Sequence, residues 1–157
     1  PPAAAELEKD IQHRKKSFAA QAGNATRGRQ VFEKNCAICH RVGTLGKVVG
    51  PQLDGIGNRG LARLTEDVLA PNRNVDIAFR ITTITTQSGH THVGLIKRSE
   101  GAQTILADPA GQETAIPTDS IKEKTPLSLS LMPATFADAL SEEEFRDLQA
   151  YLLSLRN

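Results

Sequence analysis

The sequence predicts a mainly α-helical fold with a small antiparallel β-sheet inserted into it and an extra helix at the N-terminus. Helical periodicity occupies both terminal regions, whereas residues 76–124 are rich in threonine and isoleucine and contain several turn signals. The chain has 157 residues, enough for one compact domain with a substantial core. We therefore expect an N-terminal helix and linker at 1–23 and one main domain at 24–157 that contains the β-rich insertion.

The first predicted helix spans residues 4–22 and stops at Gly23. Its apolar stripe is thin and the opening letters PPAAA resemble a linker, so this helix can belong to a preceding domain. The stripe consists of Leu7, Ile11 and Phe18.

Two further helices are predicted before the β-rich segment. One runs from about Thr26 to Asn35, with Asn24 as the N-cap whose side chain satisfies a backbone N–H of the first turn. The other spans residues 61–70 and cannot extend past Pro71, because proline lacks the N–H that a helix interior needs. Its expected inward side chains are Leu61, Leu64 and Val68.

The letters FRITTITTQSGHTHVGLIK at residues 79–97 predict a β-hairpin, because β-branched residues lie on both sides of a Ser-Gly turn. If Ser88 and Gly89 form a two-residue turn, Ile84 faces Val93 across the hairpin. The segments QTILAD and ETAIPTDSI supply two further short strands. The two histidines beyond the turn would lie near the tip, on the face of Phe79 and Ile81; they are His90 and His92.

The last predicted helix has the clearest start signal. Ser141 is the expected N-cap, and Glu144, three residues further on, completes a capping box. Leu140 and Phe145 stand where a hydrophobic staple would place them. The buried stripe of this helix is expected to consist of Phe145, Leu148, Leu152 and Leu155.

Composition and charge limit the classes of partner. The net charge is +1, but residues 1–64 carry +6, residues 65–134 carry −2 and residues 135–157 carry −3. The basic first half can steer an acidic partner, although charges on helix faces and at helix caps also explain the asymmetry. No nucleic-acid surface is expected, because base stacking uses aromatic side chains and the chain has five Phe, one Tyr and no Trp. No apolar run approaches the ~20 residues that a membrane span needs.

Both cysteines of the chain lie in the letters CAICH at residues 36–40. In such a segment, the thiols of Cys36 and Cys39 lie on one turn and can add across the two vinyl groups of a haem. The imidazole of His40 is thereby brought under the iron as an axial ligand. This spacing indicates covalent haem attachment.

Three other interpretations of the two cysteines lack supporting residues. A structural zinc site normally uses two spaced pairs of ligands, and the second pair would be His90 and His92 at an exposed hairpin tip. A redox dithiol of the thioredoxin type needs a βαβ context, which does not surround the motif. A disulfide across so short a loop would leave His40 unexplained. The motif therefore favours haem, with zinc as the second alternative.

A haem iron bound by His40 has a sixth coordination position. The single methionine, Met132, lies in a predicted loop before Pro133 and outside any core stripe, which makes it the first candidate. The gap of 92 residues between His40 and Met132 is filled largely by the β-rich segment, which can bring His90 or His92 towards the iron. Ligation by two histidines would lower the reduction potential relative to His/Met.

Four segments, GRQVFEKNCAICH, GPQLDGIGNR, LMP and DLQAYLLSL, resemble in this order the landmarks of class I c-type cytochromes. With LAPNRNV, VGLI and the β-rich segment included, residues 24–157 resemble a narrower family. That family is the C-terminal haem-binding domain of large membrane-associated dehydrogenase-like proteins of planctomycetes and verrucomicrobia. The resemblance implies the class I cytochrome c fold for this region and leaves the first helix outside.

The resemblance also implies a role for each residue of the motif. Cys36 and Cys39 would carry the thioethers of one haem c, with His40 as the proximal iron ligand and Met132 as the distal one. The carbonyl of Pro51 would accept the Nδ1 proton of His40 and so fix the orientation of the ring.

Further roles follow from the same resemblance. Leu53 and Ile56 would line the haem, and Arg59 would meet a propionate or remain solvated. The second helix would meet the last one through Gly28, Phe32 and Tyr151.

With both axial positions filled, iron cannot bind a substrate, so the expected function is one-electron transfer and not catalysis. The sequence contains no G-x-S-x-G, no dinucleotide fingerprint and no paired carboxylates in a recognisable setting. The expected partners are a redox donor and acceptor, with a fused or associated dehydrogenase domain among them. The alternative is a haem-based sensor or catalyst whose sixth position is open or labile.

The resemblance implies that the haem is attached on the far side of the cytoplasmic membrane, so we expect a periplasmic or otherwise exported protein. The opening residues PPAAAELEKD do not form a signal peptide. The chain is therefore expected to be a fragment of a longer exported protein.

Overall fold

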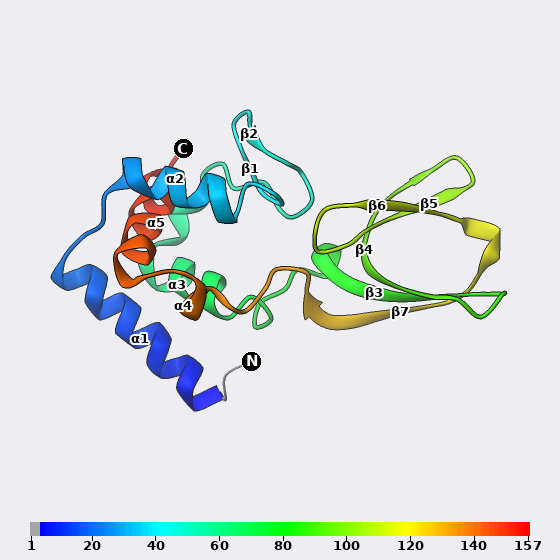
Figure 1. Ribbon diagram of the computed structural model, residues 1–157, viewed down its shortest axis with the longest axis horizontal. Helices are drawn as coiled ribbons and strands as arrows, with labels where there is room; N and C mark the ends of the chain where they lie inside the picture. Colours follow the sequence, from blue (N-terminus) through cyan, green and yellow to red (C-terminus); the bar gives the residue numbers. More distant parts are fainter. Residues whose placement is uncertain (1–3) are drawn as a thin grey trace. The chain divides into compact units, whose positions relative to one another are not determined.

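The computed structural model describes residues 4–157, which divide into two compact units (Figure 1). The helical unit consists of the described residues up to Asn74 together with Pro133–Asn157, and the sheet unit is Val75–Met132. The first three residues of the expected linker lie outside the described residues. Residues 4–157 form five α-helices, a five-stranded sheet and a two-stranded sheet. The predicted mainly α class therefore holds only in part, because helix and strand are mixed in the described residues.

The helical unit contains all the α-helices of the described residues and a small hairpin. No helix in residues 4–157 is long and apolar enough to cross a membrane. The hairpin pairs β1 (Arg41–Val42) with β2 (Leu45–Gly46), and a 3₁₀ helix, η1, covers Ile56–Arg59. The α-helices are α1 (Ala4–Ala20), α2 (Ala25–Asn35), α3 (Leu61–Leu69), α4 (Phe136–Ala139) and α5 (Glu142–Ser154).

The crossing of α2 and α5 is the centre of the helical unit. A Cβ at Gly28 would lie 1.8 Å from the carbonyl oxygen of Asp147, so only glycine lets the two backbones approach this closely. One turn further on, the ring of Phe32 is fully buried and meets Tyr151 with ring centroids 5.4 Å apart at 53°. The predicted meeting of these residues is confirmed.

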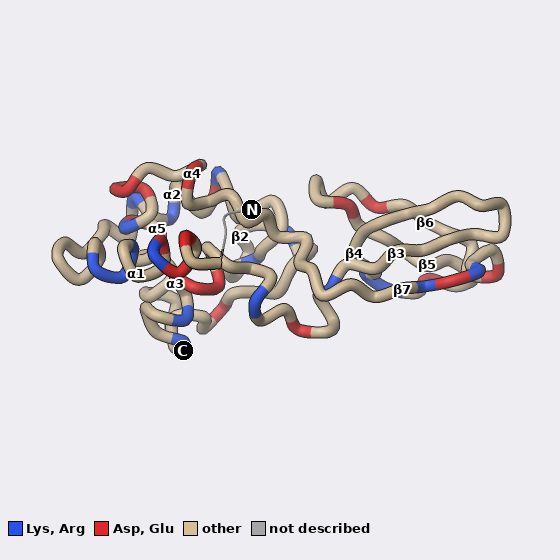
Figure 2. The backbone as a smooth tube through the Cα atoms, turned by 90° about the horizontal axis from the view of Figure 1, so that it is seen from below, with Lys and Arg blue, Asp and Glu red and all other residues tan. Residues whose placement is uncertain are grey.

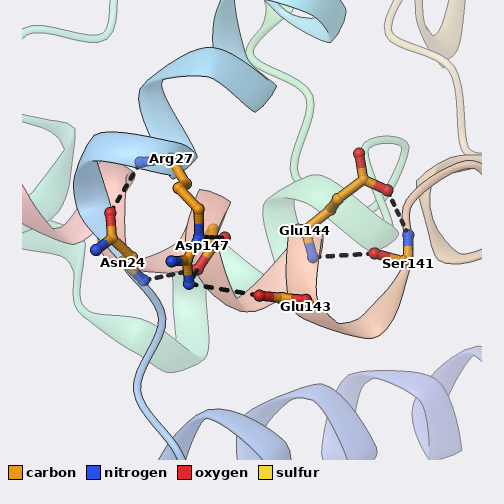
Figure 3. A network of polar contacts seen from close by, with 6 residues as sticks. All are labelled: Asn24, Arg27, Ser141, Glu143, Glu144 and Asp147. Atoms are coloured by element: carbon orange, nitrogen blue, oxygen red, sulfur yellow. Dashed lines mark hydrogen bonds and ion pairs between the residues drawn. The ribbon is translucent and has the colours of Figure 1, made fainter.

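Polar contacts lock the same two helices together, as Figure 3 shows. Asp147 of α5 is buried and accepts hydrogen bonds from the backbone N–H of Asn24 at 2.6 Å and from Nε of Arg27 at 2.9 Å. Asn24 in turn caps α2 by accepting from the N–H of Arg27. The predicted capping box of α5 is also present, since Ser141 and Glu144 each accept from the other's backbone N–H.

The first helix, α1, packs in the helical unit through one buried side chain, Ile11. The guanidinium of Arg14 lies 4.8 Å from the ring centroid of Phe145 and donates to the carbonyl of Ala137. His13 pairs with Glu142 at the start of α5. These long-range contacts make α1 part of the helical unit. A helix that belonged only to a preceding domain would not make them.

The inward side of α3 differs partly from the prediction. Leu64 is buried as expected, but the other buried side chains are Thr65 and Leu69, whereas Leu61 and Val68 are half-buried. Thr65 is tolerated there because its hydroxyl donates to the carbonyl of Leu61 and accepts from Nε2 of Gln149.

The sheet unit confirms the predicted insertion of antiparallel β-structure. Its strand order is β6-β5-β4-β3-β7, so the two edge strands are consecutive in sequence and the sheet curls on itself (Figure 1). The core consists of Ile84, Leu106 and Ile116, with Ile96 and Ile121 packed against it. The strands are β3 (Arg80–Thr86), β4 (Thr91–Glu100), β5 (Gln103–Ala107), β6 (Glu113–Pro117) and β7 (Ile121–Ser130).

The register of the hairpin between β3 and β4 differs by one residue from the prediction. Ile84 pairs with His92, not with Val93. The turn contains three residues between Thr86 and His90, and Gly89 takes a left-handed φ of 87°, which closes this longer loop. A shift of one residue exchanges the faces of a strand, so His92 lies on the face of Ile84 and not on that of Ile81.

The strand β7 was not predicted. It extends the β-structure to Ser130, beyond the expected end of the insertion near residue 124, and pairs with β3 from Arg80↔Ser130 to Thr86↔Ile121. Its letters IKEKTPLSLS are mostly polar and contain a proline, which an edge strand tolerates.

Candidate haem-binding site

The segment CAICH follows directly from α2. The backbone N–H groups of Cys36 and Ala37 both donate to the carbonyl of Phe32, at 2.8 and 3.0 Å. The N–H of His40 donates to the carbonyl of Cys36 at 2.9 Å, which winds the segment into a single turn. The two cysteines are therefore presented on one turn at the end of a helix that is anchored against α5, and both are half-buried.

The loop after the motif holds this turn from the other side. The N–H groups of Val49 and Gly50 donate to the carbonyl of Cys39 at 3.0 and 2.7 Å, and the N–H of Lys47 donates to the carbonyl of Ala37 at 2.9 Å. The motif backbone is thus fixed by local hydrogen bonds that lie within the helical unit.

His40 is oriented by its neighbours in this loop. Its Nδ1 lies 2.8 Å from the carbonyl oxygen of Pro51, an acceptor, so Nδ1 carries the proton and Nε2 keeps its lone pair. Burial lowers the pKa of His40 and outweighs the Pro51 carbonyl, which acts in the opposite direction. The ring is therefore neutral at pH 7, with Nε2 able to bind a metal.

Two glycines whose role was not predicted from the sequence shape the space around His40. A Cβ at Gly50 would lie 2.9 Å from Cε1 of the His40 ring. Gly46 has φ +94°, and a Cβ there would lie 2.0 Å from the carbonyl oxygen of His40. In the sequence, only the Gly-Pro pair at residues 50–51 pointed to such a role. The contact of Gly50 with the His40 ring depends on how the loop folds back onto the motif.

Cys36 does not have the character of a reactive thiol. Burial, with a smaller contribution from Cys39, raises the pKa of Cys36 to about 12. Redox-active thiols have a lowered pKa, because the thiolate is the nucleophile. The electrostatics of the site therefore speak against the dithiol alternative.

The zinc alternative also lacks support. Across residues 4–157, no group of three or more His, Cys, Asp or Glu side chains is placed to hold a metal ion. His90 is exposed at the hairpin tip, where its Nδ1 lies 3.3 Å from the hydroxyl of Ser88.

The predicted haem-lining residues lie in the loop and 3₁₀ turn that follow Pro51. Leu53 and Ile56 are half-buried, and the N–H of Leu53 donates to the carbonyl of Arg41. Arg59 forms an ion pair with Asp67 at 2.7 Å, so its guanidinium has a structural partner in α3.

Two apolar side chains beside the motif are unusually exposed and were not predicted as site residues. Ile38, between the cysteines, is 48% exposed, and Val48, in the clamping loop, is 43% exposed. The backbones on either side of these two residues are joined by the Lys47–Ala37 and Val49–Cys39 hydrogen bonds, so both side chains leave apolar surface exposed beside the motif.

The three candidates for a sixth ligand, Met132, His90 and His92, all belong to the sheet unit. Met132 is the last residue of that unit, and its backbone N–H donates to the hydroxyl of Ser130 at 3.1 Å. His40, by contrast, belongs to the helical unit.

The basic excess of the first 64 residues is largely neutralised within the helical unit. Figure 2 shows acidic and basic residues interspersed along its helices. Arginines of this region pair with carboxylates in Arg27–Asp147, Arg29–Glu33, Arg59–Asp67 and Arg63–Asp67. Structural ion pairs therefore account for part of the asymmetry of charge along the chain.

Comparison with known proteins agrees with this geometry. Residues 25–95 match the cytochrome c family. A stretch of 40 residues, 26% of the chain, is 45% identical to a cytochrome c-553-like protein of Synechocystis sp. and covers 37% of that protein's length. Both similarities support a c-type cytochrome.

The matched region implies covalent haem c and haem-based electron transfer. It contains Cys36, Cys39, His40 and Pro51, whereas Met132 lies outside it. The residues present fit the group: two thiols on one turn, one neutral imidazole whose Nε2 keeps its lone pair, and the exposed apolar side chains of Ile38 and Val48 beside them. The chain spans little more than a third of the relative that it matches, so the activity and partners of the whole protein are matters for proposal.

Proposed function

We propose that the chain is a one-electron carrier with a single haem c, attached through Cys36 and Cys39 and ligated by His40 and Met132. When bound, the haem iron supplies a ferrous–ferric couple. The hydrogen bond between Nδ1 of His40 and the Pro51 carbonyl carries the proposal, because it leaves Nε2 as the only ring atom that can bind a metal.

The protein residues would tune this couple in three ways. Pro51 makes the imidazole a stronger donor by accepting its Nδ1 proton, which stabilises the ferric state. Leu53 and Ile56 would limit water around the iron. Ile38 and Val48 would form an apolar rim where the haem edge meets a redox partner.

The proposal extends to the setting of the protein. Residues 24–157 would be the haem-binding domain of an exported dehydrogenase-like protein, passing electrons between a fused or associated dehydrogenase and a second redox protein in the periplasm. The segments GRQVFEKNCAICH, GPQLDGIGNR and LMP in order, with the β-rich insertion, support this assignment.

Covalent attachment is tested by removing the thiols. Cys36→Ala or Cys39→Ala should leave a single thioether, and the double variant should release all haem under denaturing conditions. The measurement is the intact mass of the denatured protein, which also counts the haems. Ile38→Ala is the matched control and should keep both thioethers. Haem retained by the double variant would contradict the proposal.

Axial ligation is tested by absorption spectra of the oxidised and reduced protein, with and without carbon monoxide. The wild type should show sharp low-spin bands, the weak far-red band of methionine bound to ferric iron, and no response to carbon monoxide. Met132→Ala should lose the far-red band, lower the midpoint potential and bind carbon monoxide. His90→Ala and His92→Ala are the controls and should behave as the wild type.

A second candidate is a haem sensor or catalyst with a labile sixth position. The observation that favours it is the location of Met132 outside the helical unit and outside the matched region. A wild-type protein that is high-spin and binds carbon monoxide readily would favour this function over electron transfer.

A further inference from the structure

The residues proposed to hold the haem are fixed by two different parts of the chain. The motif turn and His40 are held by hydrogen bonds within the helical unit, from Lys47, Val49, Gly50 and Pro51. Met132 belongs to the sheet unit, where its backbone N–H donates to the hydroxyl of Ser130. The two proposed axial ligands, His40 and Met132, therefore belong to different units.

The contacts of Met132 connect it to the base of the sheet. Its N–H donates to the hydroxyl of Ser130, the last residue of β7, at 3.1 Å. Ser130 pairs with Arg80, the first residue of β3, and Nε of Arg80 donates to the carbonyl of Val75, the first residue of the unit. The first and last residues of the sheet unit are thus linked through Arg80 and Ser130, and Met132 is hydrogen-bonded to this link through Ser130.

The strand that pairs with Ser130 also contributes to the core of the sheet. Ile84 of β3 is fully buried against Leu106 and Ile116 of the neighbouring strands. β3 pairs with β7 from Thr86↔Ile121 to Thr82↔Pro126, and beyond an irregularity in the ladder Arg80 pairs with Ser130. Because Ser130 is held by β3, its position depends on the packing of Ile84 as well as on its own hydrogen bonds.

We propose that the sheet unit is the positioning element for the sixth ligand, acting through the hydroxyl of Ser130 on the backbone of Met132. The proposal rests on the proposed function, because it takes Met132 as the distal ligand. Folding of the sheet unit is then needed for methionine ligation but not for attachment of the haem or for ligation by His40.

The physical reason is the cost of ordering. A thioether is a neutral ligand that competes with water and other groups, and a mobile loop pays conformational entropy each time it binds. A hydrogen bond that orders Met132 beforehand removes part of that cost. One such bond shifts the ratio of ligated to unligated iron by about 2- to 10-fold.

The first test uses serine variants of the protein with its haem attached. Ser130→Ala should increase the apparent affinity of the reduced protein for carbon monoxide by about 2- to 10-fold and weaken the far-red methionine band. Ser130→Thr keeps the hydroxyl and should restore both signals. Ser128→Ala, at an exposed position of the same strand, is the matched control and should equal the wild type. A Ser130→Ala variant that is indistinguishable from the wild type would overturn the proposal.

The second test loosens the core of the sheet. Ile84→Ala should lose the far-red band on warming before the fluorescence of Tyr151, the single tyrosine and a residue of α5, reports unfolding of the helical unit. The haem should stay covalently attached throughout. Loss of the band only together with the Tyr151 transition would count against a separate role for the sheet.

Met132→Ala separates the two proposals. If it keeps the wild-type band and indifference to carbon monoxide, Met132 is not the ligand and the proposed ligation itself fails. If it loses the band while Ser130→Ala and Ile84→Ala keep it, the ligand assignment holds and only the positioning role fails.

Discussion

The ring of His40 is constrained on two sides by consecutive residues. The carbonyl of Pro51 accepts a hydrogen bond from Nδ1–H, and Gly50 lies against the ring, where a Cβ would be 2.9 Å from Cε1. Such a constraint matters for an axial ligand, because the orientation of the imidazole sets its overlap with the metal and its basicity. Under the proposed ligation, the Gly-Pro pair would act on the iron through His40.

The substitution Gly50→Ala tests this constraint. The added methyl should displace the His40 ring, lengthen its hydrogen bond to Pro51 and shift the midpoint potential, with a loss of about 1–3 kcal/mol in the free energy of unfolding. Redox titration and thermal unfolding measure the two effects.

Gly43→Ala is the control for the Gly50 variant. Its Cβ would meet nothing within 4 Å, although its φ of +57° costs about 1–2 kcal/mol for a non-glycine residue. It should therefore lower stability and leave the potential unchanged. A potential that shifts equally in both variants would argue against a specific contact of Gly50 with His40.

Among the elements, the pair α2 and α5 determines where the motif lies. The end of α2 carries Cys36, and the helix is anchored by Gly28 and Phe32 in its middle and by Asp147 at its start. Burial alone would raise the pKa of Asp147, but hydrogen bonds from Arg27 and from the N–H of Asn24 lower it on balance. The carboxylate is therefore stabilised in its ionised form by folding.

Asp147→Asn should cost about 1–3 kcal/mol at neutral pH, because the amide cannot serve both donors as a charged acceptor. A group whose pKa is lower in the folded state stabilises the fold above its unfolded pKa of about 4, and this contribution is lost as the pH falls through the folded pKa. The difference between variant and wild type should therefore shrink below about pH 4. Chemical denaturation at several pH values measures it.

Glu143→Gln provides the comparison for Asp147→Asn. Glu143 pairs with the same arginine at 3.5 Å, but both side chains are more than half exposed. The change should stay within about 0.5 kcal/mol at every pH. If both substitutions lowered the free energy of unfolding equally, burial would not be the reason why Asp147 contributes to stability.

At the scale of the whole molecule, the chain folds as two units with separate cores. The helical unit buries Phe32, Phe145 and Leu148, and the sheet unit buries Ile84 and Leu106. Separate cores can unfold in separate transitions, because removing packing in one leaves the other intact.

Two leucine truncations distinguish the units. Leu106→Ala should destabilise the sheet unit and Leu148→Ala the helical unit, each by about 2–5 kcal/mol, because both side chains are buried. The fluorescence of Tyr151 should report unfolding of the helical unit alone, since the chain has no tryptophan and no other tyrosine. If Leu106→Ala shifts the Tyr151 transition as much as Leu148→Ala does, the two units unfold together.

The sequence by itself determined the features that depend on residues one or two turns apart. The motif of Cys36, Cys39 and His40 needs only its own spacing, and the capping box of Ser141 and Glu144 satisfies N–H groups within one turn. The N-cap at Asn24 and the stop at Pro71 have the same local character. Local geometry leaves few alternatives in such cases, so the residue types are sufficient.

Only the tertiary structure decided the features that depend on distant partners. The hairpin register followed from a three-residue loop closed by Gly89 and from the burial of Ile84 against other strands. The polar strand β7 exists because β3 offers it a free edge, and α1 is held by contacts with α4 and α5. Long-range pairing and burial outweigh local propensity at these positions, and they also assign His40 and Met132 to different units.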